Sequence, residues 1–409
     1  MTSVGSALVN RYNVAEVATF TTTAPVNSDT WTHVPVLGAP MPDLTMDADE
    51  ASEANTLGAS SLHYPTVRKS ALAVTTRIHT GSKGFDGSGG DADPTTPFLA
   101  LMLKSLFNSA PSAAFTGTTA AAAGGPGRTT PLKVTSATNL AVGMALMWEG
   151  EIAFIKGISG TDITLNRDFS ATPANLDPIY GAFNYSLTLG DAATYLYQLV
   201  ERDGHSWLLG PGQVMNGKIS GLAAGAGLRY ELGFEGNTFA SGFAPSTFTP
   251  SVFTDSPVIA KAGQVYIDNT ARLITDGSLD FGFLKEWRQA SSTTNTTEGK
   301  DGIEVVGHGT PSMTLKPFYA AADWTKYLAR TAFEFMAAYT VGSTDAAKAR
   351  GAVAWYMPNC QMTTKEGTAQ NQVASEVTIS GRDPQTTGSV VSAYTSLTKP
   401  IYFAVFGGR

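Results

Sequence analysis

The chain is poor in cysteine and in charge. Cys360 is the single cysteine among 409 residues, so no disulfide can form within the chain and nothing in the cysteine usage indicates an oxidising compartment. Charged residues make up 15% of the sequence, against roughly 25% in typical soluble domains. Because a large monomer usually keeps a more charged surface for solubility, the shortage favours a surface partly buried against other subunits. A low-charge monomer is the alternative.

Long apolar runs and clustered basic residues are also missing. No stretch approaches the roughly eighteen consecutive apolar residues of a membrane-spanning helix. The segment MTSVGSALVN lacks the basic start and apolar run of a secretion signal, so we expect synthesis in the cytosol and no membrane insertion. The net charge of −7 argues against tight binding of nucleic acid, which depends on clustered Lys and Arg.

Two segments show the apolar spacing of a helix in a chain that otherwise reads as strand and turn. In TTPFLALMLKSLFN a threonine can cap the first turn, Pro97 suits the first helical position, and apolar residues recur at three- and four-residue steps. The same spacing in DWTKYLARTAFEFMAAY (323–339) makes one apolar face that includes Trp324, Leu328 and Phe335. We predict a helix at each place and interpret the second apolar face as core rather than as a ligand pocket.

The order of these segments repeats along the chain. PDLTMDADE aligns with GSLDFGFLK at an offset of 235 residues (279 − 44), and SALAVTTRIHT precedes the first helix as PSMTLKPFYAA precedes the second. After the helices, GLRYELGFEG aligns with ASEVTISGRD at an offset of 147 (377 − 230), which places Tyr230 and Leu232 on Val377 and Ile379. SPVIAKAG matches KPIYFAVFG with their prolines aligned. The sequence therefore predicts a degraded duplication.

The drop in offset places 88 extra residues (235 − 147) in the first copy. The segment AAFTGTTAAAAGGPGRTTP predicts a flexible linker, and the short apolar runs that follow predict a small all-β module at about 130–183. We expect this module on the outer surface, where its removal would leave assembly intact. The predicted fold is mainly β with α (α+β), with two tandem β-sandwich or barrel domains, each covered by one helix, and the inserted module. The boundaries are 1–111 and 184–250 for the first domain, 112–183 for linker and module, and 251–409 for the second domain.

Some motifs come close to a known site but miss a required residue. GQVMNGKI (212–219) lacks the Ser or Thr of a phosphate-binding loop, and its Asn-Gly pair predicts a hairpin turn. GFDGSGGDAD gathers Asp86, Asp91 and Asp93 without the spacing of a calcium loop or the glycine of a serine-hydrolase elbow. The spacing favours a polar surface loop, with a weak ion site as the alternative.

The titratable residues show no catalytic or metal-ligand spacing. The histidines form neither HxxxH nor HExxH. An acidic run after the first repeated strand is typical of a solvated face, with a paired-carboxylate hydrolase as the alternative. We therefore expect no enzyme activity, no cofactor and no bound metal. The histidines are His33, His63, His79, His205 and His308, and the acidic run comprises Asp47, Asp49, Glu50 and Glu53.

The unit of two strands, a helix and further strands, present twice, resembles the tail tube proteins of long-tailed bacteriophages, in the version with two tube domains in one chain. KVTSATNLAVGMALMWEGEIAFIKGISG is similar to the small β-modules inserted into many phage structural proteins. Together these segments cover most of the chain. The segments that carry the tube resemblance are TWTHVPVLG, MPDLTMDADE, RKSALAVTTRIHT, TTPFLALMLKSLF and YLYQLVERDGHSWLLGPGQVMNGKISG, with their second-copy counterparts.

The resemblance implies a virion structural subunit, assembled in the host cytoplasm, whose sheets join edge to edge into stacked rings around a channel for transient DNA passage. Ring closure would pair sheet edges that otherwise invite aggregation. Two tube domains per chain imply a homotrimeric ring, and the implied further partners are tail tip, tape-measure and tail terminator proteins. The alternatives are another virion protein, from the decoration, capsid-surface or baseplate class, and then a glycan-cleaving enzyme.

Alternation along the repeated strands assigns their residues to two faces. One face is predicted to pack on a helix and the other to line the channel with mixed to negative charge. The predicted core residues are Tyr230, Leu232, Val377, Ile379, Trp324, Leu328 and Phe335, and the predicted channel residues are Arg229, Glu231, Glu376 and Thr378.

Overall fold

Strands dominate the computed structural model, which confirms the mainly β prediction. Two helices, α1 (Pro97–Phe107) and α2 (Ala321–Ala329), accompany the strands in the described residues. None of the helices in this part of the chain is long and apolar enough to cross a membrane. The described residues are 11–20, 24–25, 31–38, 40–53, 60–79, 97–112, 116–119, 124–202, 205–223, 225–237, 239–242, 258, 260, 263–289, 300–317, 321–340, 351–366, 376–385 and 394–407.

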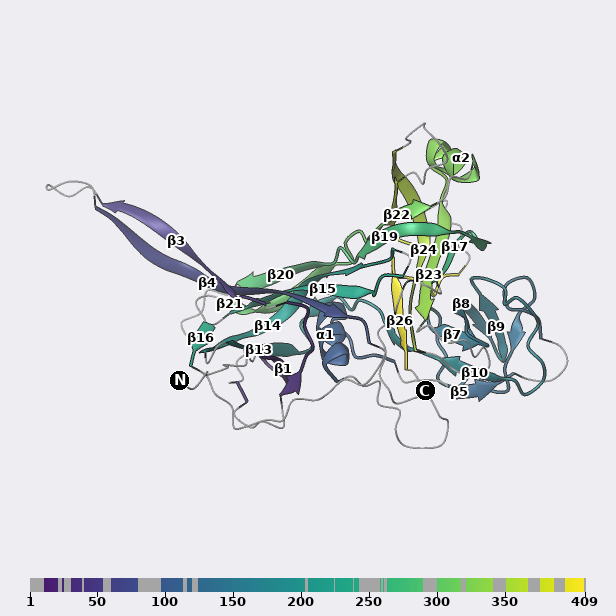
Figure 1. Cartoon of the computed structure of the whole chain (residues 1–409), viewed down its shortest axis with the longest axis horizontal. Coiled ribbons are helices and arrows are strands. Elements are labelled where there is room, and N and C mark those ends of the chain that lie inside the picture. The colour runs from purple at the N-terminus through teal and green to yellow at the C-terminus, as the bar shows by residue number, and fades with distance from the viewer. Residues whose placement is uncertain are drawn as a thin grey trace, which may run out of the picture.

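The largest sheet contains two antiparallel ladders with the same strand order (Figure 1). The first ladder runs through β2 (Thr32–His33), β1 (Arg11–Val17), β13 (Tyr195–Arg202), β14 (His205–Ser220), β15 (Arg229–Gly236), β4 (Ser60–Arg77) and β3 (Asp43–Glu53). The second ladder runs through β18 (Thr270–Ala271), β17 (Gly263–Ile267), β23 (Phe333–Thr340), β24 (Ala352–Glu366), β25 (Glu376–Gly381), β22 (Ser312–Pro317) and β19 (Ile274–Asp280). Along the chain, α1 follows β4 as α2 follows β22.

Two irregularities of register fall at matching places in the two ladders. β14 is shifted once against β13 and once against β15, and β24 is shifted once against β23 and once against β25. The four positions that flank the shifts correspond at one offset of 148 residues (360 − 212). Because a β-bulge is a specific local feature, the two coincidences align the ladders residue by residue. The corresponding positions are Leu209 with Met357, Gly212 with Cys360, Val214 with Met362 and Asn216 with Thr364.

This alignment corrects two of the predicted offsets. β15 corresponds to β25 at an offset of 145 (379 − 234) instead of 147. Followed through β4 and β22, the pairing places Asp280 on Asp43, an offset of 237 instead of 235. Each error is two residues, because alternation repeats every two residues and the apolar pattern fits equally well after such a slip.

The predicted match between the two proline-led segments is wrong. β26 (Tyr402–Phe406) pairs with β24, and the strand in the same place of the first ladder is β16 (Phe239–Ser241), which pairs with β14. Pro257 lies outside the described residues. Its neighbour Val258 bonds instead to the backbone of Ile78 (2.8 Å) and Leu228 (2.9 Å).

The two ladders are joined directly and share one core. β14 pairs with β19, and β26 pairs at its second edge with β11 (Phe183–Tyr185). Helix α1 lies in the core, where the ring of Phe107 stacks on Phe403 with centroids 5.7 Å apart and meets Phe281 and Phe283 edge-on. A single helix therefore serves apolar faces of both ladders.

The predicted second helix is wrong over its C-terminal half. α2 ends at Ala329, and Phe333–Thr340 form β23, in which all eight residues, including Phe335, are buried. Leu328, predicted in the core, is 65% exposed, and the side chain of Trp324 lies outside the described residues. Strands buried on both faces are apolar at every position, so they satisfy a helical spacing as well as a strand spacing.

The inserted residues form a six-stranded sheet that closes on itself through a bridge between Thr119 and Val134. The predicted linker is wrong for its described residues, because Thr116–Thr118 form a strand and the Gly125 and Gly127 amides bond to Pro131 and Thr130. Small residues are needed here for close packing: Gly127 has φ +121° and a Cβ there would overlap Leu165. The order of this barrel is β5 (Thr116–Thr118), β10 (Pro178–Gly181), β7 (Ala145–Trp148), β8 (Glu151–Ser159), β9 (Asp162–Leu165) and β6 (Leu132–Lys133).

The barrel packs on the second ladder, which contradicts the expectation of a dispensable outer module. Phe154 of the barrel stacks on Tyr356 at 5.4 Å, and Met336, Ala338 and Ala354 lie in the same apolar cluster. The opposite faces of β23, β24 and β26 line the shared core. Removing the barrel would therefore expose an apolar sheet face.

The second ladder carries an insertion of its own, which covers the first ladder. Between β19 and β22, the hairpin of β20 (Leu284–Gln289) and β21 (Lys300–Gly307) forms a small sheet with β12 (Gly190–Asp191). Its Trp287 and Ile303 pack in one cluster with Tyr195 and Tyr197 of β13. Each ladder thus supplies the cover for the other.

Candidate functional site

One continuous sheet surface crosses both ladders through β4, β15, β14, β19, β22, β25 and β24. We call its exposed side the polar face. A line of direct register partners runs across these strands without a break, and every member is charged or carries a hydroxyl or amide. The line is Thr75, Glu231, Lys218, Asp280, Ser312, Ser380 and Gln361, and the polar face also includes Arg77, Arg229, Ser220, Ser278, Thr314 and Thr378.

The next line of partners lies on the opposite side and is apolar except for one threonine. All of its members are 3% exposed or less, whereas all members of the polar face are half-buried or exposed. Side chains of successive strand residues point to opposite sides, so the alternation requires one buried and one solvated surface. The buried line is Thr76, Tyr230, Ile219, Leu279, Met313, Ile379 and Met362.

Arg229, Glu231 and Thr378 lie together on the polar face, as the alternation predicted, and the side chain of Glu376 lies outside the described residues. The predicted core residues Tyr230, Leu232, Val377 and Ile379 are 2% exposed or less.

The predicted lining charge needs correction. The charged residues described on the polar face are three cations (Arg77, Lys218, Arg229) and two carboxylates (Glu231, Asp280), so the surface is mixed without a negative excess. The Ser220 hydroxyl donates to Glu231. Sequence reasoning missed Lys218 because its segment was interpreted as a turn.

The predicted turn at 212–219 is wrong. These residues lie inside β14, and the Asn-Gly pair follows the register shift against β15. Gly217 is required by packing, because a Cβ there would lie 2.7 Å from Cδ2 of Leu106 on α1. The Gly217 carbonyl also accepts the amide of Phe281 at 3.0 Å.

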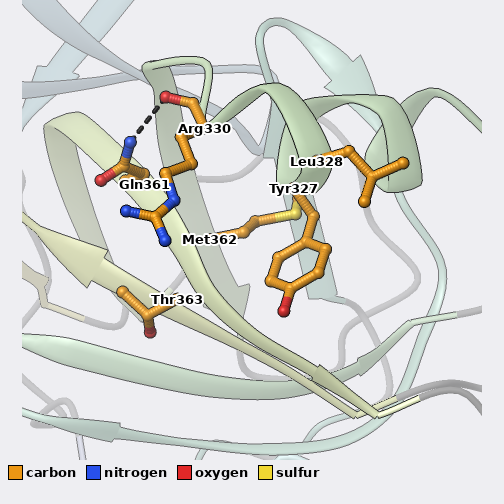
Figure 2. Close-up of a pocket in the computed structure, with 6 residues that line it drawn as sticks. All are labelled: Tyr327, Leu328, Arg330, Gln361, Met362 and Thr363. Atoms are coloured by element: carbon orange, nitrogen blue, oxygen red, sulfur yellow. Dashed lines mark hydrogen bonds between the residues drawn. The ribbon is translucent and has the colours of Figure 1, made fainter.

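A cavity of about 340 Å³ lies between α2 and β24, beside the polar face (Figure 2). The Gln361 amide donates to the Arg330 carbonyl at 2.6 Å, and Arg330 ends the helix at φ +50°. The lining offers hydrogen bonds, one cation and apolar contact, but it contains no pairing of a nucleophile with a base. It consists of Tyr327, Leu328, Arg330, Gln361, Met362 and Thr363.

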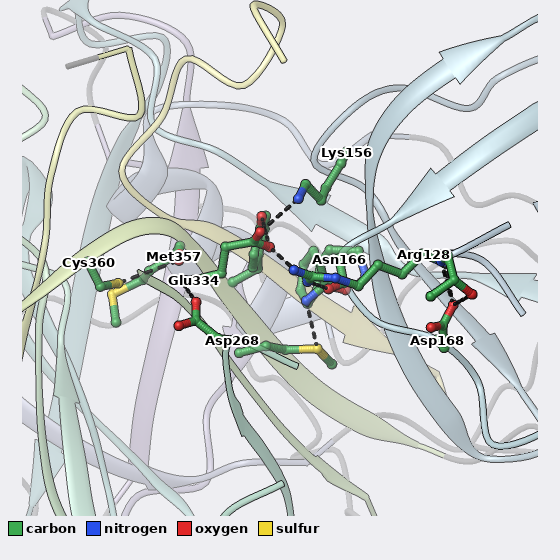
Figure 3. A network of polar contacts seen from close by, with 12 residues as sticks. Arg128, Lys156, Asn166, Asp168, Asp268, Glu334, Met357 and Cys360 are labelled. Atoms are coloured by element: carbon green, nitrogen blue, oxygen red, sulfur yellow. Dashed lines mark hydrogen bonds and ion pairs between the residues drawn. The ribbon is translucent and has the colours of Figure 1, made fainter. Parts of the chain in front are cut away.

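A buried ionic network joins the barrel to the second ladder (Figure 3). Glu334 of β23 is 4% exposed and accepts Lys156 Nζ at 2.7 Å and the Tyr356 hydroxyl at 2.9 Å, with Arg128 Nη1 at 3.7 Å. Burial, together with the charge of Glu334, raises the pKa of Tyr356 well above its usual value. Burial likewise raises the pKa of the Cys360 thiol, which keeps it protonated and a poor nucleophile. The sequence holds no local signal for this network.

The remaining titratable residues form no site in the described structure. Within that part of the chain, no three His, Cys, Asp or Glu residues are grouped to hold a metal ion. Burial, followed by the charge of Arg11 for His33 and of Lys399 for His308, lowers the pKa of these two histidines. The loop acids Asp86, Asp91 and Asp93 lie outside the described residues, as do the side chains of Asp47, Asp49, Glu50 and Glu53.

Comparison with models of known protein families gives no match, and comparison with curated proteins gives no relative. The arguments about function therefore rest on the geometry of the polar face and on the sheet edges at its two ends.

Proposed function

We propose that this chain is a structural subunit of a phage tail tube, in which the polar faces of several copies line a channel for DNA. The observation that carries the proposal is the unbroken line of polar partners across both ladders, from Thr75 to Gln361, with a buried line beside it. A channel wall needs one surface that tolerates water and another that packs on a core, and this sheet has both.

The equal strand order of the two ladders supports two tandem tube domains in one chain, each derived from the same ancestral unit. The matched bulges at an offset of 148 residues and the matched places of α1 and α2 favour duplication over coincidence. Two domains per chain lead to a ring of three chains if the ring holds six domains.

The long ribbon of β3 and β4 supports assembly. It projects away from the body of the molecule, at the end opposite the barrel (Figure 1). Beyond Asp43 its two strands pair with each other over ten further residues of β3. An isolated two-stranded ribbon is marginally stable, so such a projection favours a partner in an assembly. Tail tip, tape-measure and terminator proteins would be further partners in the virion, and we assign the chain no chemistry.

Electron microscopy of the purified full chain tests the proposal. Hollow tubes or rings with three chains per ring are expected. Six chains per ring would refute the trimer, and a protein that stays monomeric at high concentration would refute the tube. Discrete particles bound to capsids would favour a decoration protein instead.

Cysteine labelling separates a channel from an outer surface. Arg229→Cys lies on the exposed polar face, and Ser170→Cys lies exposed on the barrel as the matched control. The native Cys360 is fully buried and contributes little background. A bulky maleimide-polymer should label both variants as monomers but only Ser170→Cys after assembly. Labelling of Arg229→Cys in intact tubes would place the polar face outside.

A further inference from the structure

We infer that the junction between β14 and β19 inside the chain is repeated between chains, where the end of β24 pairs with β3 of a second copy. The inference rests on the proposed ring and goes further, since it names the two strand edges, their register and the partner. It uses the internal correspondence of the ladders as a template.

The internal junction has a defined geometry. Lys218 of β14 faces Asp280 of β19 in antiparallel register, and Ile219 faces Leu279. The Phe281 amide donates to the Gly217 carbonyl at 3.0 Å, so the residues 217 and 281 form a hydrogen-bonded pair. The adjacent Lys218–Asp280 pair is therefore of the non-hydrogen-bonded kind, in which the two Cα atoms lie closest.

The matched bulges carry this geometry to the other end of each ladder. At an offset of 148, Gly217 and Lys218 correspond to Lys365 and Glu366 of β24. At an offset of 237, Asp280 and Phe281 correspond to Asp43 and Leu44 of β3. The template therefore pairs Glu366 with Asp43 of a second copy and directs the Leu44 amide to the Lys365 carbonyl.

Both edges are open in the described part of the chain. β24 pairs with β23 only up to Cys360 and with β26 only up to Tyr356, so its residues 361–366 have a ladder partner on one side, β25. β3 pairs with β4 alone, and the Asp43 side chain is exposed. An open edge is a template for another strand, and these two edges stand at opposite ends of the continuous sheet. Joining them head to tail in successive copies makes every junction alike and closes a ring.

Engineered cysteine pairs in the full chain test the register. Asp43→Cys with Glu366→Cys, treated with oxidised glutathione, should give disulfide-linked dimers and trimers on non-reducing gels. Lys218→Cys with Asp280→Cys is the matched positive control, since it should close a disulfide within one chain. Asp43→Cys with Lys365→Cys is the negative control, because adjacent strand positions point to opposite faces.

The outcomes separate this inference from the proposed function. Multimers from the 43/366 pair, with at least tenfold less product from the 43/365 pair, support the junction. Rings or tubes seen by electron microscopy without cross-linking of the 43/366 pair would overturn the junction and leave the tube proposal standing. A chain that stays monomeric while the 218/280 disulfide forms would overturn both.

Discussion

Replacing Glu334 with glutamine should destabilise the chain strongly, because the substitution leaves Lys156 buried without its counter-charge. Both side chains are about 5% exposed, and their nitrogen and oxygen are 2.7 Å apart. After the substitution, the ammonium group keeps its contact with the face of Tyr394, at 4.6 Å from the ring centroid. Breaking a buried ion pair from one side costs about 3–5 kcal/mol, so Glu334→Gln should lie in that range.

The reverse substitution should cost less. In Lys156→Met, Glu334 keeps the Tyr356 hydroxyl at 2.9 Å and Arg128 at 3.7 Å. An expected loss of about 1–3 kcal/mol follows from one missing partner at a charged group. The double variant leaves neither charge unpaired, and glutamine can keep the bond to Tyr356. Its cost should therefore fall below that of Glu334→Gln alone, with a coupling of about 2 kcal/mol between the two sites.

Equilibrium unfolding in urea, followed by tryptophan fluorescence and circular dichroism, measures these free energies. Lys133→Met is the matched control, since its ion pair with Asp162 spans 3.6 Å between largely solvated side chains. That control should change stability by less than about 1 kcal/mol. Additive losses in the double variant, or a loss below about 1 kcal/mol for Glu334→Gln, would refute the argument that the network holds the barrel on the ladder.

Three further outcomes are expected. Burial lowers the pKa of Lys285 to about 7 from 10.5, so the unfolded chain binds more protons between these values and stability should rise with pH there, by at most about 1.4 kcal/mol per unit; Lys285→Met should flatten this rise in urea midpoints measured at pH 7 and pH 9. Deleting the barrel and bridging to Tyr185 should give insoluble protein, since it uncovers the face of Met336 and Tyr356, and a soluble deletion variant that still assembles would contradict the described packing. Glu366→Lys should lower the concentration needed for assembly a few-fold by restoring the opposite charges found at Lys218 and Asp280, and light scattering against concentration, with Glu304→Lys as control, would show an unchanged threshold if Glu366 is not at the junction.

Some parts of the fold could be predicted from local sequence alone. α1 was predicted correctly, because Pro97 opens it and its apolar residues have the spacing of a helix with one buried face. The alternation in β15 was correct for the same reason, since one face of that strand is solvated and the other is buried. The order of the duplication also survived, because it depends on the succession of elements and not on exact register.

Other parts were decided by tertiary contacts. β23 lies between the shared core and the barrel, so both of its faces are apolar and its sequence has no strand period to read. The residues predicted as linker became barrel strand and tight turns because close packing against Leu165 needs small side chains, whatever their low complexity suggests.

The polar face shows the division most clearly. Alternation within β15 is a local property, and by itself it predicts that Arg229 and Glu231 lie on the exposed side of the strand. The position of Lys218 beside Asp280 depends on a bulge in β14 and on pairing between segments far apart in the chain. Local sequence encodes which side of a strand is wet, because each side chain meets water or core by itself. Only the folded sheet decides which strands meet, because register is a relation between two segments that neither of them carries alone.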